Sequence, residues 1–461
     1  MAERDLTLGP LGPHLRAMAV PAALGMLFTT LYNVVDTYYA GWISTAAQAG
    51  LSVSFAAFMM LMAVGIGLNV GGSALIGGAL GERDRDGARG YAGGALGAAA
   101  GLSLILMLGG MAYGDGLLAL MRVEEEVFQA SSSYLQVMFV GLPAFMIGFT
   151  ANGVLTAQGD TNTNKKAQMV AFAANVGLNP LLIYGALGLP GLGFHGIAVS
   201  TILIQTGVAI WLVSRALKTQ AMQGVSLAEF LPTWRLTADL ARQSAPASLN
   251  MMVMMAGGFL IQTHLQPFGA AAVAGYGVAF RVEQLILLPI LAISFATMPI
   301  VAQNFGARDY DRVRQGVTLA VAVALAMSLV GAVMLSLGGV AMTRLFTSDP
   351  AAIASGAAYL QLAALMMPAY SLMFIVTSFF QGVKRPVWSL IIGVYRQVFA
   401  LAFYPALFVA YTSWGLTAVW AGLFTAVWSG FVVAVILTHL IGRASIGGMR
   451  PDFGAVRAAA S

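Results

Sequence analysis

The chain has 461 residues, of which 59% are hydrophobic and only 9% are charged. A soluble domain carries roughly 25% charged residues, so this composition excludes a soluble globular protein and indicates an integral membrane protein. Because cysteine is absent, disulfides, a structural zinc site and thiol chemistry are excluded as well. The N-terminal segment has mixed charge and leads into a full-length apolar run, so we expect no cleavable signal peptide.

Apolar runs separated by charged or turn-rich breaks predict twelve transmembrane helices and an all-α integral membrane fold. Each run is long enough, at about 20 residues or more, to cross a hydrocarbon core roughly 30 Å thick. In chain order we expect the helices near residues 15–41, 50–80, 90–112, 128–158, 163–187, 193–214, 242–267, 271–304, 314–341, 353–382, 388–411 and 415–441.

Basic residues gather on one side of the predicted membrane. With a cytoplasmic N-terminus, nineteen lysines and arginines fall on the cytoplasmic side and two, Arg122 and Arg344, on the other side. Since lysine and arginine are enriched in cytoplasmic loops, we expect a multi-pass protein of the cell (inner) membrane with both termini in the cytoplasm. The same asymmetry accounts for the net charge of +5 without a nucleic-acid partner.

The second half of the chain repeats the first half at an offset of 225 residues. Five pairs of segments share this register: "PAALGM" at Pro21 and "PASLNM" at Pro246, "AQAGLSVSF" ending at Phe55 and "AVAGYGVAF" ending at Phe280, "GERDRDGAR" from Gly81 and "GARDYDRVR" from Gly306, "LPAF" at Pro143 and "MPAY" at Pro368, and "NPLL" at Pro180 and "YPAL" at Pro405. Five matches in one register are not a chance result of the biased composition.

The repeat predicts two lobes of six helices each. Six is an even number, so both halves enter the membrane in the same direction and are parallel repeats, related by a pseudo-two-fold axis along the membrane normal. We expect an N-terminal lobe at residues 1–222 and a C-terminal lobe at residues 223–461, joined by the long cytoplasmic loop near 215–241. Two similar bundles with a cleft between them suit transport by alternating access.

Asp36 is an ionisable residue in the middle of the first apolar span, and such residues usually face a partner, a bundle interior or a cavity. Asn33 lies three residues earlier, on the same helix face. The fifth and sixth spans supply neutral oxygen atoms from Asn175, Asn179, Ser200 and Thr201. One carboxylate with several neutral oxygens suits a hard monovalent cation, and the carboxylate suits a proton equally well. The alternative is that Asp36 is a satisfied interhelical hydrogen-bonding residue with no role in transport.

Three further charged residues fall inside predicted spans of the second half: Arg281, Glu283 and Arg396. Arg281 and Glu283 are two residues apart, so they cannot pair on one helix face. We expect an ion pair between Glu283 and Arg396 with a structural role, and the alternative is that these residues face the substrate.

Pro21 lies in the same span as Asp36. A proline can kink a membrane helix and free backbone carbonyls for a ligand or for water, so we predict a hinge at this residue. The chain carries no ATPase motif, because no Walker lysine follows any glycine-rich segment. We therefore expect a protein that is not an enzyme, that needs no cofactor, and that is driven by an ion gradient or works downhill.

Six motifs, in this order along the chain, resemble those of the multidrug and toxic compound extrusion (MATE) family: "YNVVDTYYAG", "GALGERDRDGAR", "LTAQGDTNTNKKA", "NVGLNPLLIYG", "GLGFHGIAVST" and "AQNFGARDYDRVR". The resemblance covers nearly the whole chain. It implies two pseudo-symmetric six-helix lobes around a central cavity that opens alternately to either side. It also implies export of cationic or amphipathic small molecules in exchange for Na⁺ or H⁺, by a monomer whose other partners are membrane lipids.

The resemblance places the family's first-lobe cation site on Asp36, Asn175, Asn179 and Thr201, with Asn33 adjacent and Na⁺ held at Asp36, Asn175 and Asn179. One branch of the family has an aspartate where this sequence has Asn179. Another branch has acidic residues in the seventh and tenth spans, where this sequence has none. The sequence therefore leaves the choice between Na⁺ and H⁺ open.

Three other functions remain as alternatives. A lipid-linked saccharide or lipid flippase of the same superfamily would favour a strongly cationic cavity, and only Arg281 and Arg396 are basic residues within the spans. A membrane scaffold or receptor would not need Asp36. A major-facilitator transporter also has two parallel halves, but the sequences after the second and eighth spans fit the extrusion family better.

Overall fold

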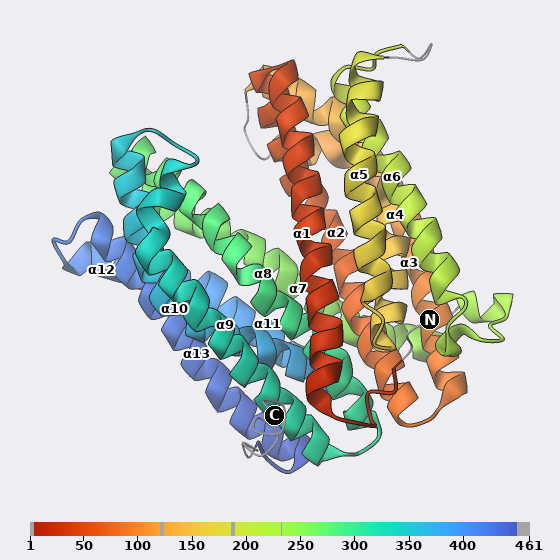
Figure 1. Ribbon diagram of the computed structural model, residues 1–461. Helices are drawn as coiled ribbons and strands as arrows, with labels where there is room; N and C mark the ends of the chain where they lie inside the picture. The colour runs from red at the N-terminus through yellow and green to blue at the C-terminus, as the bar shows by residue number, and fades with distance from the viewer. Residues whose placement is uncertain (1–3, 120–123, 186–189, 232, 450–461) are drawn as a thin grey trace. The chain divides into compact units, whose positions relative to one another are not determined.

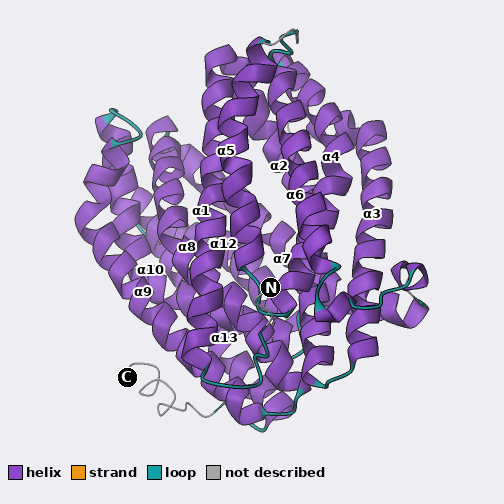
Figure 2. Ribbon diagram, turned by 45° about the vertical axis from the view of Figure 1, so that its right-hand side comes forward, coloured by secondary structure: helices purple, strands orange, loops and turns teal. Residues whose placement is uncertain are grey.

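The computed structural model describes residues 4–119, 124–185, 190–231 and 233–449. Within these ranges the chain is a set of helices joined by turns, without strands (Figure 2). Twelve helices or helical stretches in the described residues are long and apolar enough to cross a membrane. The predicted all-α membrane fold with twelve spans is therefore confirmed. Arg122, Arg450 and Arg457, which enter the predicted charge asymmetry, lie outside the described residues.

The chain forms two compact units, and each unit is made of two separate segments of the chain. The first unit comprises Met1–Asp5 and Pro21–Ser248, and the second comprises Leu6–Val20 and Leu249–Ser461. The chain therefore passes from one unit to the other inside two helices, at Pro21 and after Ser248. The lobe boundary expected between residues 222 and 223 stays a prediction.

The first unit is built mainly from the helices of the first half. Its elements are α1 (Leu11–Ile43) from Pro21 onward, α2 (Thr45–Gly81), α3 (Arg85–Ala119), α4 (Glu125–Ala157), α5 (Asn162–Tyr184), α6 (Phe194–Ala216), η1 (Gln220–Met222), η2 (Leu227–Phe230) and α7 (Trp234–Leu265) up to Ser248. Inside this unit α2 packs along α4 and α3, α4 packs on α6, and α6 packs on α5.

The second unit repeats that packing scheme with the helices of the second half (Figure 1). Here α8 packs along α10 and α9, α10 packs on α13, and α13 packs on α12. Its elements are the start of α1, the rest of α7, η3 (Gln266–Phe268), α8 (Ala270–Gly306), α9 (Tyr310–Arg344), α10 (Pro350–Gly382), α11 (Val387–Val394), η4 (Tyr395–Ala400), α12 (Leu401–Tyr411) and α13 (Leu416–Ile446). The stretch α11–η4–α12 is the eleventh span.

The repeat is visible in the backbone of individual turns. After α2 and after α8 the chain turns through a left-handed residue, Arg83 and Arg308, each with φ 59°. In both turns the next amide bonds back to the helix: Asp84 N–H to the Ala79 carbonyl (2.9 Å) and Asp309 N–H to the Asn304 carbonyl (3.0 Å). This bond closes the last helical turn in the same way in both halves. Because the residues of each pair are 225 positions apart, the sequence repeat is also a structural repeat.

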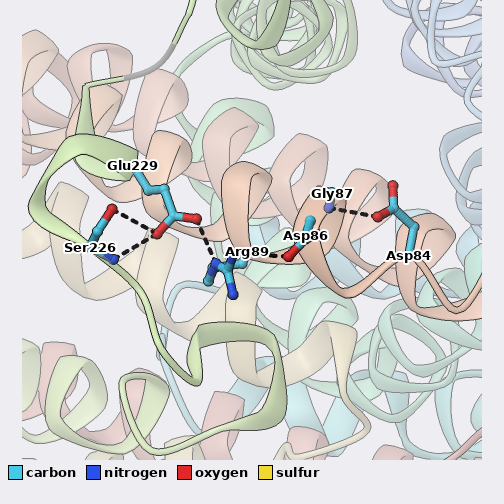
Figure 3. A network of polar contacts seen from close by, with 6 residues as sticks. All are labelled: Asp84, Asp86, Gly87, Arg89, Ser226 and Glu229. Atoms are coloured by element: carbon cyan, nitrogen blue, oxygen red, sulfur yellow. Dashed lines mark hydrogen bonds and ion pairs between the residues drawn. The ribbon is translucent and has the colours of Figure 1, made fainter.

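The connection between the halves is fixed to the start of α3 (Figure 3). Glu229 accepts hydrogen bonds from the backbone N–H of Ser226 (2.6 Å) and from Nε of Arg89 (2.5 Å). A Cβ on Gly93 or Gly97 would overlap the backbone carbonyl of Glu229 or Phe230, respectively. These glycines therefore let η2 approach α3 at backbone distance.

A corresponding anchor holds the N-terminal segment on the second unit. Leu6 is fully buried, and its N–H donates to Oε1 of Gln303 (2.9 Å) at the end of α8. Arg312 at the start of α9 donates to the carbonyls of Leu6 (3.2 Å) and Gly9 (3.0 Å). The first part of α1 is thus attached to the second unit, although the part that carries Asp36 belongs to the first unit.

Candidate cation site

Asp36 lies in the last third of α1, in the part that belongs to the first unit. Its side chain is only 6% exposed, although its neighbours Val34 and Tyr38 are exposed. Tyr32 precedes Asp36 by one helical turn and is also buried, so the two side chains share a buried face of α1. A carboxylate inside a membrane helix is stable only where other groups satisfy it.

Two asparagine side chains of α5 donate hydrogen bonds to the carboxylate of Asp36. Nδ2 of Asn175 and Nδ2 of Asn179 both donate to Oδ1 of Asp36, each at 2.8 Å. The two asparagines are one helical turn apart and fully buried, so a single face of α5 presents both amides to α1. Oδ2 of Asp36 accepts a longer hydrogen bond, 3.4 Å, from the hydroxyl of Thr201 in α6.

A second layer of polar groups orients these partners. The Tyr32 hydroxyl donates to Oγ1 of Thr201 at 3.1 Å, and the Ser200 hydroxyl donates to Oδ1 of Asn179. Oδ1 of Asn175 is buried and has no hydrogen-bond partner among the described residues. A buried oxygen without a donor is unusual in a folded protein and marks a place where a cation or a proton donor fits.

Pro180 shapes the end of this face of α5. Proline has no N–H, so the carbonyl of Val176, four residues earlier, has no helical donor. The hydroxyl of Tyr39 on α1 approaches this carbonyl at 3.4 Å. The proline that follows Asn179 therefore creates a further point of contact between α5 and α1.

The structure brings together four of the five predicted residues, namely Asp36, Asn175, Asn179 and Thr201. Asn33 is exposed and lies outside the cluster of hydrogen bonds around Asp36. Tyr32, which the sequence analysis did not select, takes part instead. Its position one turn before Asp36 is the only signal that the sequence offered for it. The chemical role of all these residues stays a prediction.

The cluster can bind a cation in two ways. One carboxylate, the free Oδ1 of Asn175 and the hydroxyl of Thr201 are hard oxygen ligands of the kind that Na⁺ takes in proteins. Alternatively, Asp36 can take up a proton, which removes a buried charge that is costly at membrane depth. The amide donors stabilise the carboxylate when it is ionised, because charge-assisted hydrogen bonds are stronger than neutral ones.

In the second unit the expected ion pair between Glu283 and Arg396 is not formed. Within the described part of the chain, the hydrogen-bond donor to Glu283 is the hydroxyl of Tyr359, at 2.6 Å from Oε2. The guanidinium of Arg396 lies over the ring of Tyr370, 5.3 Å from its centroid. The prediction of a direct pair was wrong because Tyr359 on α10 occupies the position next to the carboxylate. Arg281 is exposed.

Pro21 lies at the point of α1 where the chain passes from the second unit to the first. The residues before it, among them Leu11, Leu15 and Met18, are buried in the apolar core of the second unit. A proline at this point interrupts the helical hydrogen bonds between the two parts of α1. The hinge itself stays a prediction, and its place between two compact units agrees with that role.

A comparison with known protein families identifies the family of this chain. The MatE family model matches residues 21–181 and, a second time, residues 246–406. The chain belongs to the MATE family. The two matches start at Pro21 and Pro246, 225 residues apart, so the family's own repeat coincides with the internal repeat. MATE proteins are membrane transporters and not enzymes, which agrees with the absence of an ATPase motif.

Relatives of this MATE protein include proteins named for multidrug resistance, for FAD transport and for multidrug export. Probable multidrug resistance protein YoeA of Bacillus subtilis is 28% identical over 300 residues, which are 64% of this chain and 65% of that protein. An FAD transporter of Shewanella oneidensis is 26% identical over 403 residues, 85% of this chain and 87% of that protein. Multidrug export protein MepA of Staphylococcus aureus is 22% identical over 447 residues, 96% of this chain and 97% of that protein.

Solved structures of MATE transporters share the fold. One, described as the outward-facing conformation of a multidrug resistance MATE family transporter of the MOP superfamily, matches with a TM-score of 0.89 at 25% sequence identity. The match covers 98% of this chain and 99% of that chain. The twelve-helix architecture of this protein is therefore the MATE architecture.

Proposed function

We propose that this MATE protein is a secondary active multidrug efflux transporter. It exports cationic or amphipathic compounds in antiport with Na⁺ or H⁺ by alternating access, as a monomer in the cell (inner) membrane with both termini in the cytoplasm. The names of the relatives YoeA and MepA support drug export, and the MepA match extends over 96% of the chain. The charge asymmetry of the loops supports the orientation.

The single observation that carries the coupling mechanism is the buried carboxylate of Asp36, held by Asn175 and Asn179 inside one unit. An ion that binds here drives transport only if its affinity differs between the outward-facing and inward-facing states. The energy available is about 2.3 kcal/mol for one charge in a potential of 100 mV. That energy corresponds to a substrate gradient of roughly forty- to fifty-fold, which is ample for efflux.

A second candidate is export of a flavin nucleotide, because the relative from Shewanella oneidensis is named an FAD transporter and aligns with 85% of the chain. FAD is anionic at neutral pH, whereas multidrug substrates are cationic or amphipathic, so the two candidates require cavities of opposite polarity. Transport of a lipid-linked saccharide stays a further alternative. The same vesicle assay separates all three substrates.

The test is transport into inverted or reconstituted vesicles with Na⁺ and pH gradients imposed separately. A cationic dye, FAD and a lipid-linked saccharide are offered in turn. We expect gradient-driven movement of the dye by the wild-type protein and its loss in Asp36→Asn. Asp115→Asn is the matched control, because this carboxylate is exposed, lies on α3 of the same unit and accepts a hydrogen bond from the Ser132 hydroxyl.

Each outcome decides one part of the proposal. Movement of FAD alone would favour the second candidate, and the gradient that drives movement identifies the coupling ion. If Asp36→Asn, inserted at the wild-type level, transports the dye as the wild type does, Asp36 is not the coupling residue.

A further inference from the structure

Glu283 is a buried carboxylate in α8 of the second unit, and the coupling mechanism proposed above does not use it. Its side chain is 2% exposed. One oxygen, Oε2, accepts the Tyr359 hydroxyl at 2.6 Å. The other oxygen, Oε1, is buried and has no hydrogen-bond partner among the described residues. A buried, half-satisfied carboxylate is costly when it is ionised, so its retention at this position calls for a reason.

The surroundings of Glu283 are aromatic. Tyr359 stands edge-on to Tyr276 with ring centroids 5.0 Å apart, and it packs on Trp420 of α13 at 5.3 Å. All three rings are buried. The ring of Tyr359, whose hydroxyl donates to Glu283, therefore packs between rings from α8 and α13. None of these aromatic residues donates a hydrogen bond to Oε1.

Arg396 is the charged group that interacts with Glu283 electrostatically, although the two side chains form no ion pair. It belongs to the π-helical turn η4, which interrupts the eleventh span. Its aliphatic stem lies against Gly430 of α13, where a Cβ would come within 3.1 Å of it. π-Helical turns are rare and are frequent at functional sites. The π-helical turn carries Arg396, Gly430 leaves room for its aliphatic stem, and its guanidinium lies over the Tyr370 ring.

The groups that face Glu283 come from all the elements around it. Its own helix contributes Tyr276, α10 contributes Tyr359 and Tyr370, and η4 contributes Arg396. Helix α9 also packs against α8, but its charged residues stand only at its two ends, within Tyr310–Arg314 and at Arg344. Arg396 is thus the one cation in this set of groups.

The internal repeat indicates that this polar site is specific to the second unit. At an offset of 225 residues, Glu283 corresponds to Phe58 in the first unit, where the ring of Phe58 packs edge-on against Phe145 at 5.1 Å. The donor Tyr359 corresponds to a buried tyrosine, Tyr134, whereas Tyr370 and Arg396 correspond to Phe145 and Ala171. The first unit therefore fills this position with apolar packing, and a stable unit does not need a carboxylate there.

The reverse holds for the site around Asp36. At the same offset, Asp36, Asn175, Asn179 and Thr201 correspond to Ile261, Ala400, Tyr404 and Ala426. The cluster around Asp36 in the first unit and the cluster around Glu283 in the second unit therefore occupy different positions of the repeat.

We propose that Glu283 is a second proton-binding site of this transporter, separate from Asp36, which takes up one proton at Oε1 and releases it again. Proton uptake at Oε1 removes the buried charge, and a neutral carboxyl costs much less to bury than an ionised one. Release is also supported, because Tyr359 donates to the carboxylate and Arg396 supplies a positive charge nearby. No covalent bond other than O–H changes. Only the role of this proton in antiport rests on the proposed function; the binding of the proton does not.

The direct test is infrared difference spectroscopy of the full chain in lipid while the pH is changed. A protonated buried carboxyl gives a C=O stretching band that ionised carboxylates lack. We expect a pH-dependent band that is lost in Glu283→Gln and retained in Asp36→Asn. In Tyr359→Phe the band remains but shifts in frequency, because the hydrogen bond at Oε2 is gone. Thermal unfolding of each variant checks that it is folded.

The outcomes separate this site from the proposed function. A pH-dependent band lost in Glu283→Gln supports the site even if Asp36→Asn transports normally. A wild-type protein without such a band overturns the proposal, and so does a double variant Asp36→Asn/Glu283→Gln that keeps the band of Asp36→Asn at the same intensity. A band that responds to Na⁺ and not to pH overturns it as well. If Glu283→Gln does not fold, the frequency in Tyr359→Phe decides, and an unshifted band contradicts the assignment.

Discussion

The side-chain amide of Asn179 donates to Oδ1 of Asp36 at 2.8 Å. Oδ1 of the same side-chain amide accepts a hydrogen bond from the Ser200 hydroxyl. This bond orients the amide so that its NH₂ group points toward the carboxylate of Asp36. An aspartate at this position would present an oxygen to Asp36 in place of a donor. Position 179 therefore controls whether Asp36 is a single buried carboxylate or half of an acidic pair.

Asn179→Asp should make transport more dependent on protons. Two carboxylates at hydrogen-bond distance cannot both be ionised at low cost, so the pair holds a proton between them. We expect transport to fall about tenfold at alkaline pH, the factor that ~1.4 kcal/mol represents. Acidic medium should restore it. Dye flux into vesicles at a series of pH values measures this.

Asn162→Asp is the control for that change, because it makes the same substitution at the first residue of α5, away from Asp36. It should leave the pH profile unaltered. An Asn179→Asp protein with the wild-type profile would show that the contact with Asp36 does not govern proton loading.

Pro21→Ala should slow transport and leave the protein folded. Alanine restores the missing N–H of α1, and an interior alanine favours the helix by about 3 kcal/mol over proline. A continuous α1 would resist bending at the point where the chain passes between the units. We expect a several-fold lower turnover with an unchanged or raised Tm. Pro143→Ala is the control, since α4 lies wholly in the first unit; equal turnover in both variants would contradict the hinge.

Gly71→Ala should destabilise the first unit. A Cβ at Gly71 would come within 2.8 Å of the backbone nitrogen of Ser244 in the first part of α7, and one at Gly67 would overlap the side chain of Ser248. Forcing the two helices apart should lower the free energy of unfolding by about 1–3 kcal/mol, the usual cost of adding a methyl group to a well-packed core. The lower Tm should be seen in lipid or detergent. Gly101→Ala, where no atom lies within 4 Å of the added methyl, should not lower the Tm.

The parts of the fold that the sequence predicts are those set by local patterns. Apolar runs are long enough to identify all twelve spans, and the repeated "GERD" and "GARD" segments form the same turn at Arg83 and Arg308. The cluster around Asp36 was predictable because Asn175 and Asn179 lie one helical turn apart and so share a face.

The parts that the sequence does not predict depend on tertiary packing. Asn33 and Tyr32 both lie about one turn before Asp36, and only the packing of α1 selects Tyr32 as the buried one. The donor to Glu283 is a tyrosine in an apolar span, which resembles ordinary core packing in the sequence. The π-helical turn at Arg396 shifts the helical register, so the spacing of charges does not reveal which side chains meet. Pro21 and Pro246 stand at or near the places where α1 and α7 change units, but prolines also stand inside α4, α5 and α10, so a proline alone does not identify such a place.

Acid should release the connection between the halves through Glu229. The backbone N–H of Ser226, and then the guanidinium of Arg89, hold the pKa of Glu229 below its usual range. A carboxyl whose pKa is lowered by folding contributes stability that is present above its ordinary pKa and is lost as the pH falls through the lowered value. The protection factors of the amides in η2 and its flanking residues, which compare the measured exchange rate with the intrinsic rate at the same pH, should therefore be several-fold lower at acidic pH than at neutral pH. Glu229→Gln should show low protection factors at every pH, whereas Asp86→Asn, which removes only an exposed partner of Arg89, should change them little. High protection of η2 in Glu229→Gln at neutral pH would mean that the backbone packing on Gly93 and Gly97 alone holds this segment on α3.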